Sequence, residues 1–113
     1  MKYAFMKDRN ELYIKNIKKH YTEMQKELDE IDDNYDNFIN DYVIRKAITF
    51  DLMQIGELFG NLSDDVRKTV NQSDIRGIKD VRNFIVHGYC QISNEEIWKT
   101  IHDDLPYLIS VLP

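Results

Sequence analysis

Apolar residues between positions 8 and 31 recur at alternating steps of three and four. This spacing places them in one stripe along an amphipathic helix, because an α-helix makes one turn every 3.6 residues. The stripe consists of Ile14, Ile17, Tyr21, Met24, Leu28 and Ile31. A polar, turn-rich segment at 32–37 ends the pattern. We therefore predict one long helix over about 8–31, followed by a first connection.

A second helical pattern runs from about residue 40 to residue 62. Its main stripe comprises Ile44, Ile48, Leu52, Ile55, Phe59 and Leu62, and it is widened by Val43, Ala47, Phe50 and Leu58. A helix that is apolar over so much of its circumference should be buried against several neighbours, so we expect it to be the central helix. Arg45, Asp51 and Glu57 interrupt it. Because charged residues are rarely buried unless paired, they either line a polar cleft or lie on the exposed edge, and Arg45 and Glu57 are candidate cleft residues.

Capping residues divide the second half of the chain into shorter helices. Ser63, followed by two acidic residues, predicts the start of a short helix that reaches about residue 70. Ser73 can cap a further helix over about 74–87, which Gly88 would end. These features continue the all-helical pattern.

The last helix is predicted to begin at Ser93. The segment Ser93–Glu96 fits a capping box, and the apolar spacing from Trp98 onward is helical. Pro106 lacks an N–H group and should kink or restart this helix. We therefore predict an all-α fold of four or five helices in an antiparallel up-and-down bundle, forming a single domain over 1–113.

Composition agrees with a small helical protein. The 113 residues include only 4 glycines and 2 prolines, which leaves little turn chemistry for a β-rich fold. No apolar run is long enough to cross a membrane, the N-terminus does not resemble a signal peptide, and the single cysteine excludes an internal disulfide. We therefore expect a cytoplasmic protein with no membrane partner.

Charge is distributed unevenly along the chain. The net charge of −5 excludes a global basic field as the basis of nucleic-acid binding. Residues 27–41 contain seven acidic and no basic residues. Residues 66–82 contain five basic and two acidic residues, a local surplus of +3, which favours an anionic ligand nearby.

The helix predicted at 74–87 carries the densest chemistry in the chain. At 100° per residue its polar positions fall on one stripe, which consists of Arg76, Asp80, Asn83 and His87. Arg82 lies instead at the edge of the apolar face. Its side chain must therefore extend outward to solvent or contact a partner such as an anion or a second subunit. His87 comes just before the helix-ending glycine, and Tyr89 follows.

These residue types suit phosphate chemistry. His87 can give or take a proton near neutral pH, and Arg82 can bind a phosphate and stabilise charge that develops on it. Asn83 can orient the imidazole or contact the phosphate. The three histidines are scattered and the lone cysteine cannot build a zinc site, so we predict no metal centre. No phosphate-binding glycine loop is present, and we predict no cofactor.

The segment Arg82–Tyr89 resembles the R-x4-H-x-Y signature of HEPN-domain ribonuclease toxins of the HepT type. Ile55-Gly56-Glu57 is similar to a segment of that family's second helix. Further similar segments are Val43-Ile44-Arg45, Ile97-Trp98 and Asp103-Asp104-Leu105-Pro106. The resemblance covers the chain from about residue 8 to the end. One departure is expected at the final helix, which we predict to be slightly short because the sequence stops at residue 113.

The resemblance implies a specific activity and partners. HEPN proteins of this kind are symmetric homodimers in which two R-x4-H motifs form one composite cleft. They cleave RNA without a metal through attack of the ribose 2′-hydroxyl, with Arg82 and His87 as the catalytic residues here and Asn83 and Tyr89 in support. The family's toxin–antitoxin systems, of the kind called type VII, imply a minimal nucleotidyltransferase antitoxin of the MntA type. That antitoxin would transfer AMP to Tyr89.

Two other interpretations remain open at this point. The chain could be a non-catalytic HEPN accessory module that binds a nucleotidyltransferase, with Arg82 and His87 serving only to contact a ligand. It could also be a plain helical dimerisation domain, which leaves the position of Arg82 unexplained. The complete set of Arg82, Asn83, His87 and Tyr89 favours catalysis.

Overall fold

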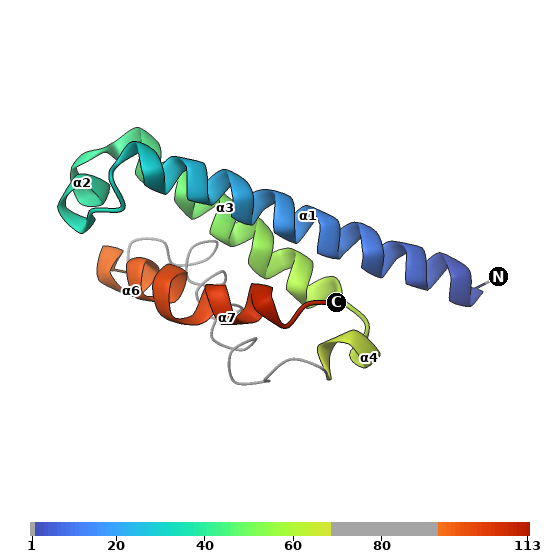
Figure 1. The fold of residues 1–113 in the computed structure, drawn as a ribbon. Coiled ribbons are helices and arrows are strands. Elements are labelled where there is room, and N and C mark those ends of the chain that lie inside the picture. The colour runs from blue at the N-terminus through green and yellow to red at the C-terminus, as the bar shows by residue number, and fades with distance from the viewer. Residues whose placement is uncertain (1, 69–92) are drawn as a thin grey trace.

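The computed structural model describes residues 2–68 and 93–113, and for residues 2–8 it describes the backbone only. The chain begins with the long helix α1 (Lys2–Glu30), followed by α2 (Tyr35–Asn40), α3 (Tyr42–Asn61) and α4 (Asp64–Arg67). After the gap come α6 (Asn94–Lys99), the π-helical turn η1 (Thr100–Asp104) and α7 (Leu105–Ser110). The described residues contain no strand, so the all-α prediction is confirmed (Figure 1). The helix predicted at 74–87 lies outside the described residues.

Helices α1 and α3 form the body of the fold. They lie side by side and antiparallel, and α6, η1 and α7 run back antiparallel to α1 (Figure 1). Lys18 Nζ donates a hydrogen bond to the Pro113 carbonyl, 3.2 Å away, which ties the C-terminus to α1. The bundle arrangement predicted from the apolar stripes is therefore present among these elements.

The predicted stripes supply most of the core. Residues of α1, α3 and the C-terminal helices that are essentially inaccessible to solvent include Ile17, Met24, Ile48, Leu52, Ile55, Phe59, Ile101, Leu105 and Leu108. Two residues of the widened stripe behave differently, because Val43 is 66% and Phe50 is 51% exposed. The expectation that α3 is buried around its circumference is wrong for this face, where the described residues provide no cover.

The connection between α1 and α3 contains a helix that the sequence analysis missed. Asp32 and Asp33 adopt left-handed backbone angles, with φ of 56° and 48°, and turn the chain out of α1. Asn34 then caps α2 by accepting a hydrogen bond from the Asn37 amide, and Asp41 caps α3 by accepting one from the Ile44 amide. Phe38 on α2 is fully buried and its ring centroid lies 5.1 Å from that of Trp98.

The C-terminal segment restarts at the proline, as predicted. The Ser93 hydroxyl accepts a hydrogen bond from the Glu96 amide and opens α6. The helix then widens into η1, in which the Leu105 N–H bonds to the Thr100 carbonyl. Pro106 lies in the first turn of α7, where backbone N–H groups have no partner within the helix, so its missing N–H removes no hydrogen bond of α7.

One predicted cap takes a different role. Ser63 occupies the N-cap position of α4, but its side chain makes no capping hydrogen bond. Its hydroxyl instead accepts a hydrogen bond from Asn10 Nδ2 at 2.9 Å, and its amide donates to Asn10 Oδ1 at 3.1 Å. This reciprocal pair fixes the start of α4 to α1, which is a tertiary contact that local sequence cannot reveal.

Candidate functional site

Most of the predicted site residues lie in the part of the chain that the structure does not describe. These are the catalytic pair Arg82 and His87, the supporting residues Asn83 and Tyr89, and the candidate cleft residues Arg76 and Asp80. Their proposed roles therefore stay predictions.

The other two predicted cleft residues, Arg45 and Glu57, are described, and both lie on α3. Arg45 is half-buried, and its guanidinium donates a hydrogen bond to the Ile39 carbonyl at the end of α2. Glu57 is exposed. The contact gives Arg45 a structural task in holding α2 against α3, and its part in a cleft stays a prediction.

A cluster of ionisable side chains joins α1 to α3. His20 Nδ1 lies 2.9 Å from Asp51 Oδ1 and 3.9 Å from Glu23 Oε2. His20 and Glu23 face the same way because they are one turn apart on α1. The Asp51 side chain is only 4% exposed, whereas that of Glu23 is 45% exposed, so the cluster runs from the core to the surface.

Glu27 extends this cluster by one more turn of α1. Burial, a hydrogen bond with Asp51 and the negative charges of Asp51, Glu23 and Glu30 raise its pKa from the ordinary 4.5 to about 8. Among the described residues, no N–H or hydroxyl donor reaches Glu27 Oε1 or Asp51 Oδ2. Two carboxyl groups can hydrogen-bond to each other only when one is protonated. The geometry therefore favours a neutral Glu27 that donates to Asp51 near neutral pH.

We name the set His20, Glu23, Glu27 and Asp51 the α1–α3 cluster. Chemically it can hold a proton or a cation. Its carboxylates repel a phosphate, so the cluster is not suited to grip RNA. The sequence analysis noted Asp51 as a charge within an apolar helix but did not connect it with His20. The i,i+3 spacing of His20 and Glu23 was a usable signal. It places both side chains on one face of α1, where they could meet an acidic residue of a neighbouring helix.

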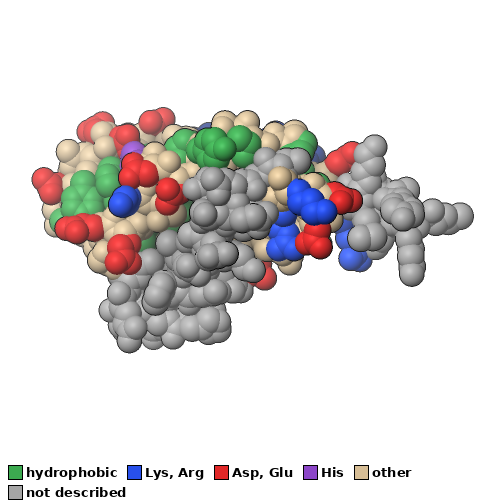
Figure 2. Space-filling model, turned by 90° about the horizontal axis from the view of Figure 1, so that it is seen from below, with side chains coloured by type: hydrophobic (Ala, Val, Ile, Leu, Met, Phe, Trp, Pro, Cys, Tyr) green, Lys and Arg blue, Asp and Glu red, His purple; other side chains and the backbone are tan. Residues whose placement is uncertain are grey.

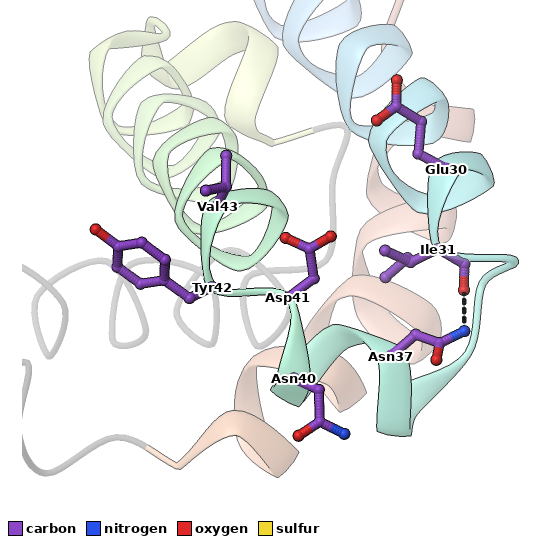
Figure 3. Close-up of a pocket in the computed structure, with 7 residues that line it drawn as sticks. All are labelled: Glu30, Ile31, Asn37, Asn40, Asp41, Tyr42 and Val43. Atoms are coloured by element: carbon purple, nitrogen blue, oxygen red, sulfur yellow. Dashed lines mark hydrogen bonds between the residues drawn. The ribbon is translucent and has the colours of Figure 1, made fainter.

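A second feature is a groove where α1 ends and α3 begins. Its volume is about 470 Å³ and it is lined by Glu30, Ile31, Asn37, Asn40, Asp41, Tyr42 and Val43 (Figure 3). Asn37 Nδ2 donates to the Ile31 carbonyl at 3.1 Å, and Asp41 caps α3. The lining contains two acidic residues and no basic one, so the groove is poorly suited to a phosphate group.

The charge distribution on one face of the molecule agrees with this. Acidic side chains predominate at the end formed by α2 and α6, whereas basic and acidic side chains lie intermixed toward α4 (Figure 2). At the acidic end, His102 Nε2 bonds to Asp33 Oδ1 at 2.7 Å, and its Nδ1 bonds to the Trp98 carbonyl at 2.9 Å. An RNA backbone would be repelled from the acidic end.

Among the residues that the structure describes, none of the helices combines the length and apolarity needed to span a bilayer.

Comparison with known proteins shows which family the sequence matches. A sequence model of the family described as "Ribonuclease HepT-like" matches residues 12–113. A protein of Methanocaldococcus jannaschii named "Putative RNase" is 31% identical over 75 residues, which cover 66% of this chain and 69% of that protein. A protein of Caldanaerobacter subterraneus with the same designation is 28% identical over 75 residues, which cover 66% of this chain and 67% of that protein.

A second protein of Methanocaldococcus jannaschii, also named "Putative RNase", is 31% identical over 75 residues. The aligned residues cover 66% of this chain and 62% of that protein. No solved structure gives a significant match.

Proposed function

Because the chain belongs to the family of HepT-like ribonucleases, we propose that it is an endoribonuclease whose catalytic residues are Arg82 and His87. The observation that carries this proposal is the extent of the family match. It spans residues 12–113 and therefore includes the whole Arg82–Tyr89 motif. The all-helical architecture of the described residues agrees with it.

The reaction needs no metal in this proposal. The ribose 2′-oxygen forms a bond to the adjacent phosphorus while the bond from phosphorus to the 5′-oxygen breaks, which leaves a 2′,3′-cyclic phosphate. The 2′-hydroxyl loses a proton and the departing 5′-oxygen gains one. His87 suits either proton transfer, and the Arg82 guanidinium can stabilise the charge that grows on the phosphate oxygens. Asn83 would orient the imidazole or the phosphate.

The active form in this proposal is a homodimer with the two motifs in one composite cleft. Two exposed apolar side chains on α3 support a partner surface. Val43 and Phe50 are seven residues apart and therefore share one face of the helix, and each is more than half exposed. Burial of such side chains against a second copy would be favourable.

The protein acts, in the same proposal, as the toxin of a two-gene toxin–antitoxin system. Its partner would be a minimal nucleotidyltransferase that transfers AMP to Tyr89. A bulky anionic group two residues beyond His87 would block a phosphate-binding cleft by its size and its charge. Mass spectrometry after co-expression with a neighbouring nucleotidyltransferase gene tests this part. AMP on any residue other than Tyr89 would contradict the proposed switch.

The ribonuclease proposal is tested by incubating the purified protein with RNA in the presence of EDTA. We expect cleavage in EDTA, products that end in 2′,3′-cyclic phosphate, and loss of cleavage in Arg82→Ala. Arg82→Lys should also be poor, because lysine keeps the charge but loses the planar pair of donors. Lys26→Ala, which removes an exposed cation on α1 outside both the motif and the basic segment 66–82, is the matched control. An Arg82→Ala variant that cleaves as fast as the control would refute the assignment.

A further inference from the structure

The α1–α3 cluster has the composition of a metal site. One imidazole nitrogen, from His20, and one carboxylate oxygen from each of Glu23 and Asp51 all lie within 4.8 Å of one another. We infer that His20, Glu23 and Asp51 bind a divalent transition-metal ion such as Zn²⁺, which clamps α1 to α3. This inference is independent of the proposed ribonuclease activity, and it revises the expectation from the sequence that the chain holds no metal.

The distances between the donor atoms fit a small cation. Nitrogen and oxygen ligands of Zn²⁺ lie about 2.0–2.2 Å from the metal, so two ligands of a tetrahedral site are roughly 3.4 Å apart. The His20 nitrogen lies 2.9 Å from the Asp51 oxygen and 3.9 Å from the Glu23 oxygen, which brackets that value. The Glu23 and Asp51 oxygens are no more than 4.8 Å apart, so side-chain shifts of about one ångström would bring all three donors to this spacing.

The second observation is the buried carboxylate of Asp51. The residue is 3% exposed, and among the described residues its carboxylate meets only the His20 imidazole and the Glu27 carboxyl group. A buried carboxylate is costly unless its negative charge is compensated, and neither partner is a permanent cation. A metal ion next to this carboxylate would supply that compensation. Glu27, which hydrogen-bonds with Asp51, would then hold a metal ligand in place.

The ligand types narrow the choice of ion. Imidazole favours Zn²⁺, Fe²⁺, Ni²⁺ or Cu²⁺, whereas sites for Ca²⁺ and Mg²⁺ are built from oxygen ligands alone. Zn²⁺ accepts both imidazole nitrogen and carboxylate oxygen as ligands, so one imidazole and two carboxylates can hold it. Three protein ligands leave a fourth position for water. Because the ligands come from residues 20, 23 and 51, the ion would join the two longest helices.

The site's location also fits a structural role. The helices that the ion would join, α1 and α3, share the most extensive contact in the described structure. His20 also packs edge-on against Phe50, with ring centroids 6.2 Å apart, which restricts the orientation of the imidazole. A restricted imidazole gives up less rotational freedom when it binds a metal. The clamp would therefore stabilise the helix pair without taking part in RNA cleavage.

Zinc binding to the full-length protein tests the inference. The protein is stripped with a chelator, dialysed, and titrated with ZnCl₂ by calorimetry near neutral pH. We expect one Zn²⁺ per chain with a Kd of about 10 µM or tighter. Glu23→Gln should weaken binding at least about tenfold, and because Glu23 is half-exposed this variant should fold normally. His20→Gln should weaken binding similarly.

Two matched controls separate this site from other metal-binding groups in the chain. His102→Gln removes a histidine that pairs with a single carboxylate, and Cys90→Ser removes the one thiol. Both should bind zinc like the wild type. Equal affinity in the wild type, Glu23→Gln and His20→Gln overturns the inference, because zinc would then bind elsewhere. Absence of binding at a zinc concentration of about 100 µM overturns it as well.

Thermal unfolding provides a second readout. Zinc should raise the Tm of the wild type and of both control variants, and at the same zinc concentration it should raise the Tm of Glu23→Gln by clearly less. If Glu27 and Asp51 hold only a proton, the Tm will depend on pH but not on zinc, and this outcome contradicts the metal site. RNA cleavage is measured separately in EDTA, at a temperature well below the Tm. Cleavage that persists there supports the ribonuclease proposal whatever the result for zinc, so the two proposals can fail independently.

Discussion

The imidazole of His20 and the carboxylate of Asp51 lie 2.9 Å apart and connect the two longest helices of the fold, α1 and α3. The pair unites a residue at the partly exposed surface of α1 with a residue that is 3% exposed on α3. It explains how a charged side chain is tolerated within the apolar stripe of the central helix.

Replacement of His20 should destabilise the protein. His20→Ala removes the hydrogen bond to Asp51 and leaves a buried carboxylate without that donor, which costs about 1–3 kcal/mol. Urea unfolding in the presence of EDTA measures the effect without any contribution from a bound metal. Lys19→Ala, at an exposed neighbouring position, should change stability by no more than about 0.5 kcal/mol. Similar values for the two variants would show that the pair contributes little.

Glu27 should make stability depend on pH. Burial, more than its hydrogen bond and nearby charges, raises its pKa from 4.5 to about 8, so the fold favours the protonated form. Its contribution is complete below about pH 4.5 and is lost as the pH rises through about 8. Glu27→Gln stays neutral and should flatten the profile between these values. At the alkaline end the variant should be more stable by about 1–2 kcal/mol, after allowance for solvent screening of a partly buried group.

The measurement for Glu27 is urea unfolding at several pH values in the presence of EDTA. Glu11→Gln, at an exposed position on the same helix, is the control and should follow the wild-type profile. A Glu27→Gln profile that falls as steeply as that of the wild type would mean that another group is responsible for the pH dependence.

The contact between Asp33 and His102 should add a small stabilisation. Their atoms lie 2.7 Å apart and join the turn after α1 to η1, but both side chains are partly exposed, which limits the gain to about 0.5–1 kcal/mol. Asp33→Asn should therefore lower the Tm by about 2–5 °C. Asp32→Asn is a close control, because both aspartates have positive φ and asparagine tolerates this conformation. Equal Tm values for the two variants would contradict the prediction.

The reciprocal pair of Asn10 and Ser63 should couple α1 to the start of α4. Two hydrogen bonds, at 2.9 and 3.1 Å, join the side chain of Asn10 to Ser63. Asn10→Ala should cost about 1–2 kcal/mol, and Glu11→Ala at the exposed next position should cost much less. A double-mutant cycle with Ser63→Ala checks the coupling. Additive effects of Asn10→Ala and Ser63→Ala would show that the two side chains do not interact.

Sequence alone predicted the two main helices because their signal repeats over many turns. The stripe that contains Ile17 and Met24, and the stripe that contains Ile48 and Leu52, are buried as expected. The helix α2 was missed because six residues are too few for a periodic pattern. Its start depends on a single cap, Asn34, inside a segment whose polar composition indicates a turn.

The α1–α3 cluster could not be predicted for a different reason. The partners His20 and Asp51 are 31 positions apart, and their contact depends on how two helices rotate against each other. Periodicity locates the apolar faces but does not say which polar side chains meet at their edges. For Ser63 the local pattern predicted the start of α4 but not the contact of the side chain. The hydroxyl accepts a hydrogen bond from Asn10 instead of capping the helix.

The proposed catalytic pair was inferred from the sequence motif and the family, and it stays a prediction. The most direct test is the rate of RNA cleavage by His87→Ala, measured in EDTA beside the wild type and the exposed-site control Lys26→Ala. We predict that the rate of His87→Ala falls by at least about 100-fold, because the variant lacks the group that transfers the proton, while the rate of Lys26→Ala stays near that of the wild type. A His87→Ala rate equal to that of the wild type would contradict the catalytic assignment.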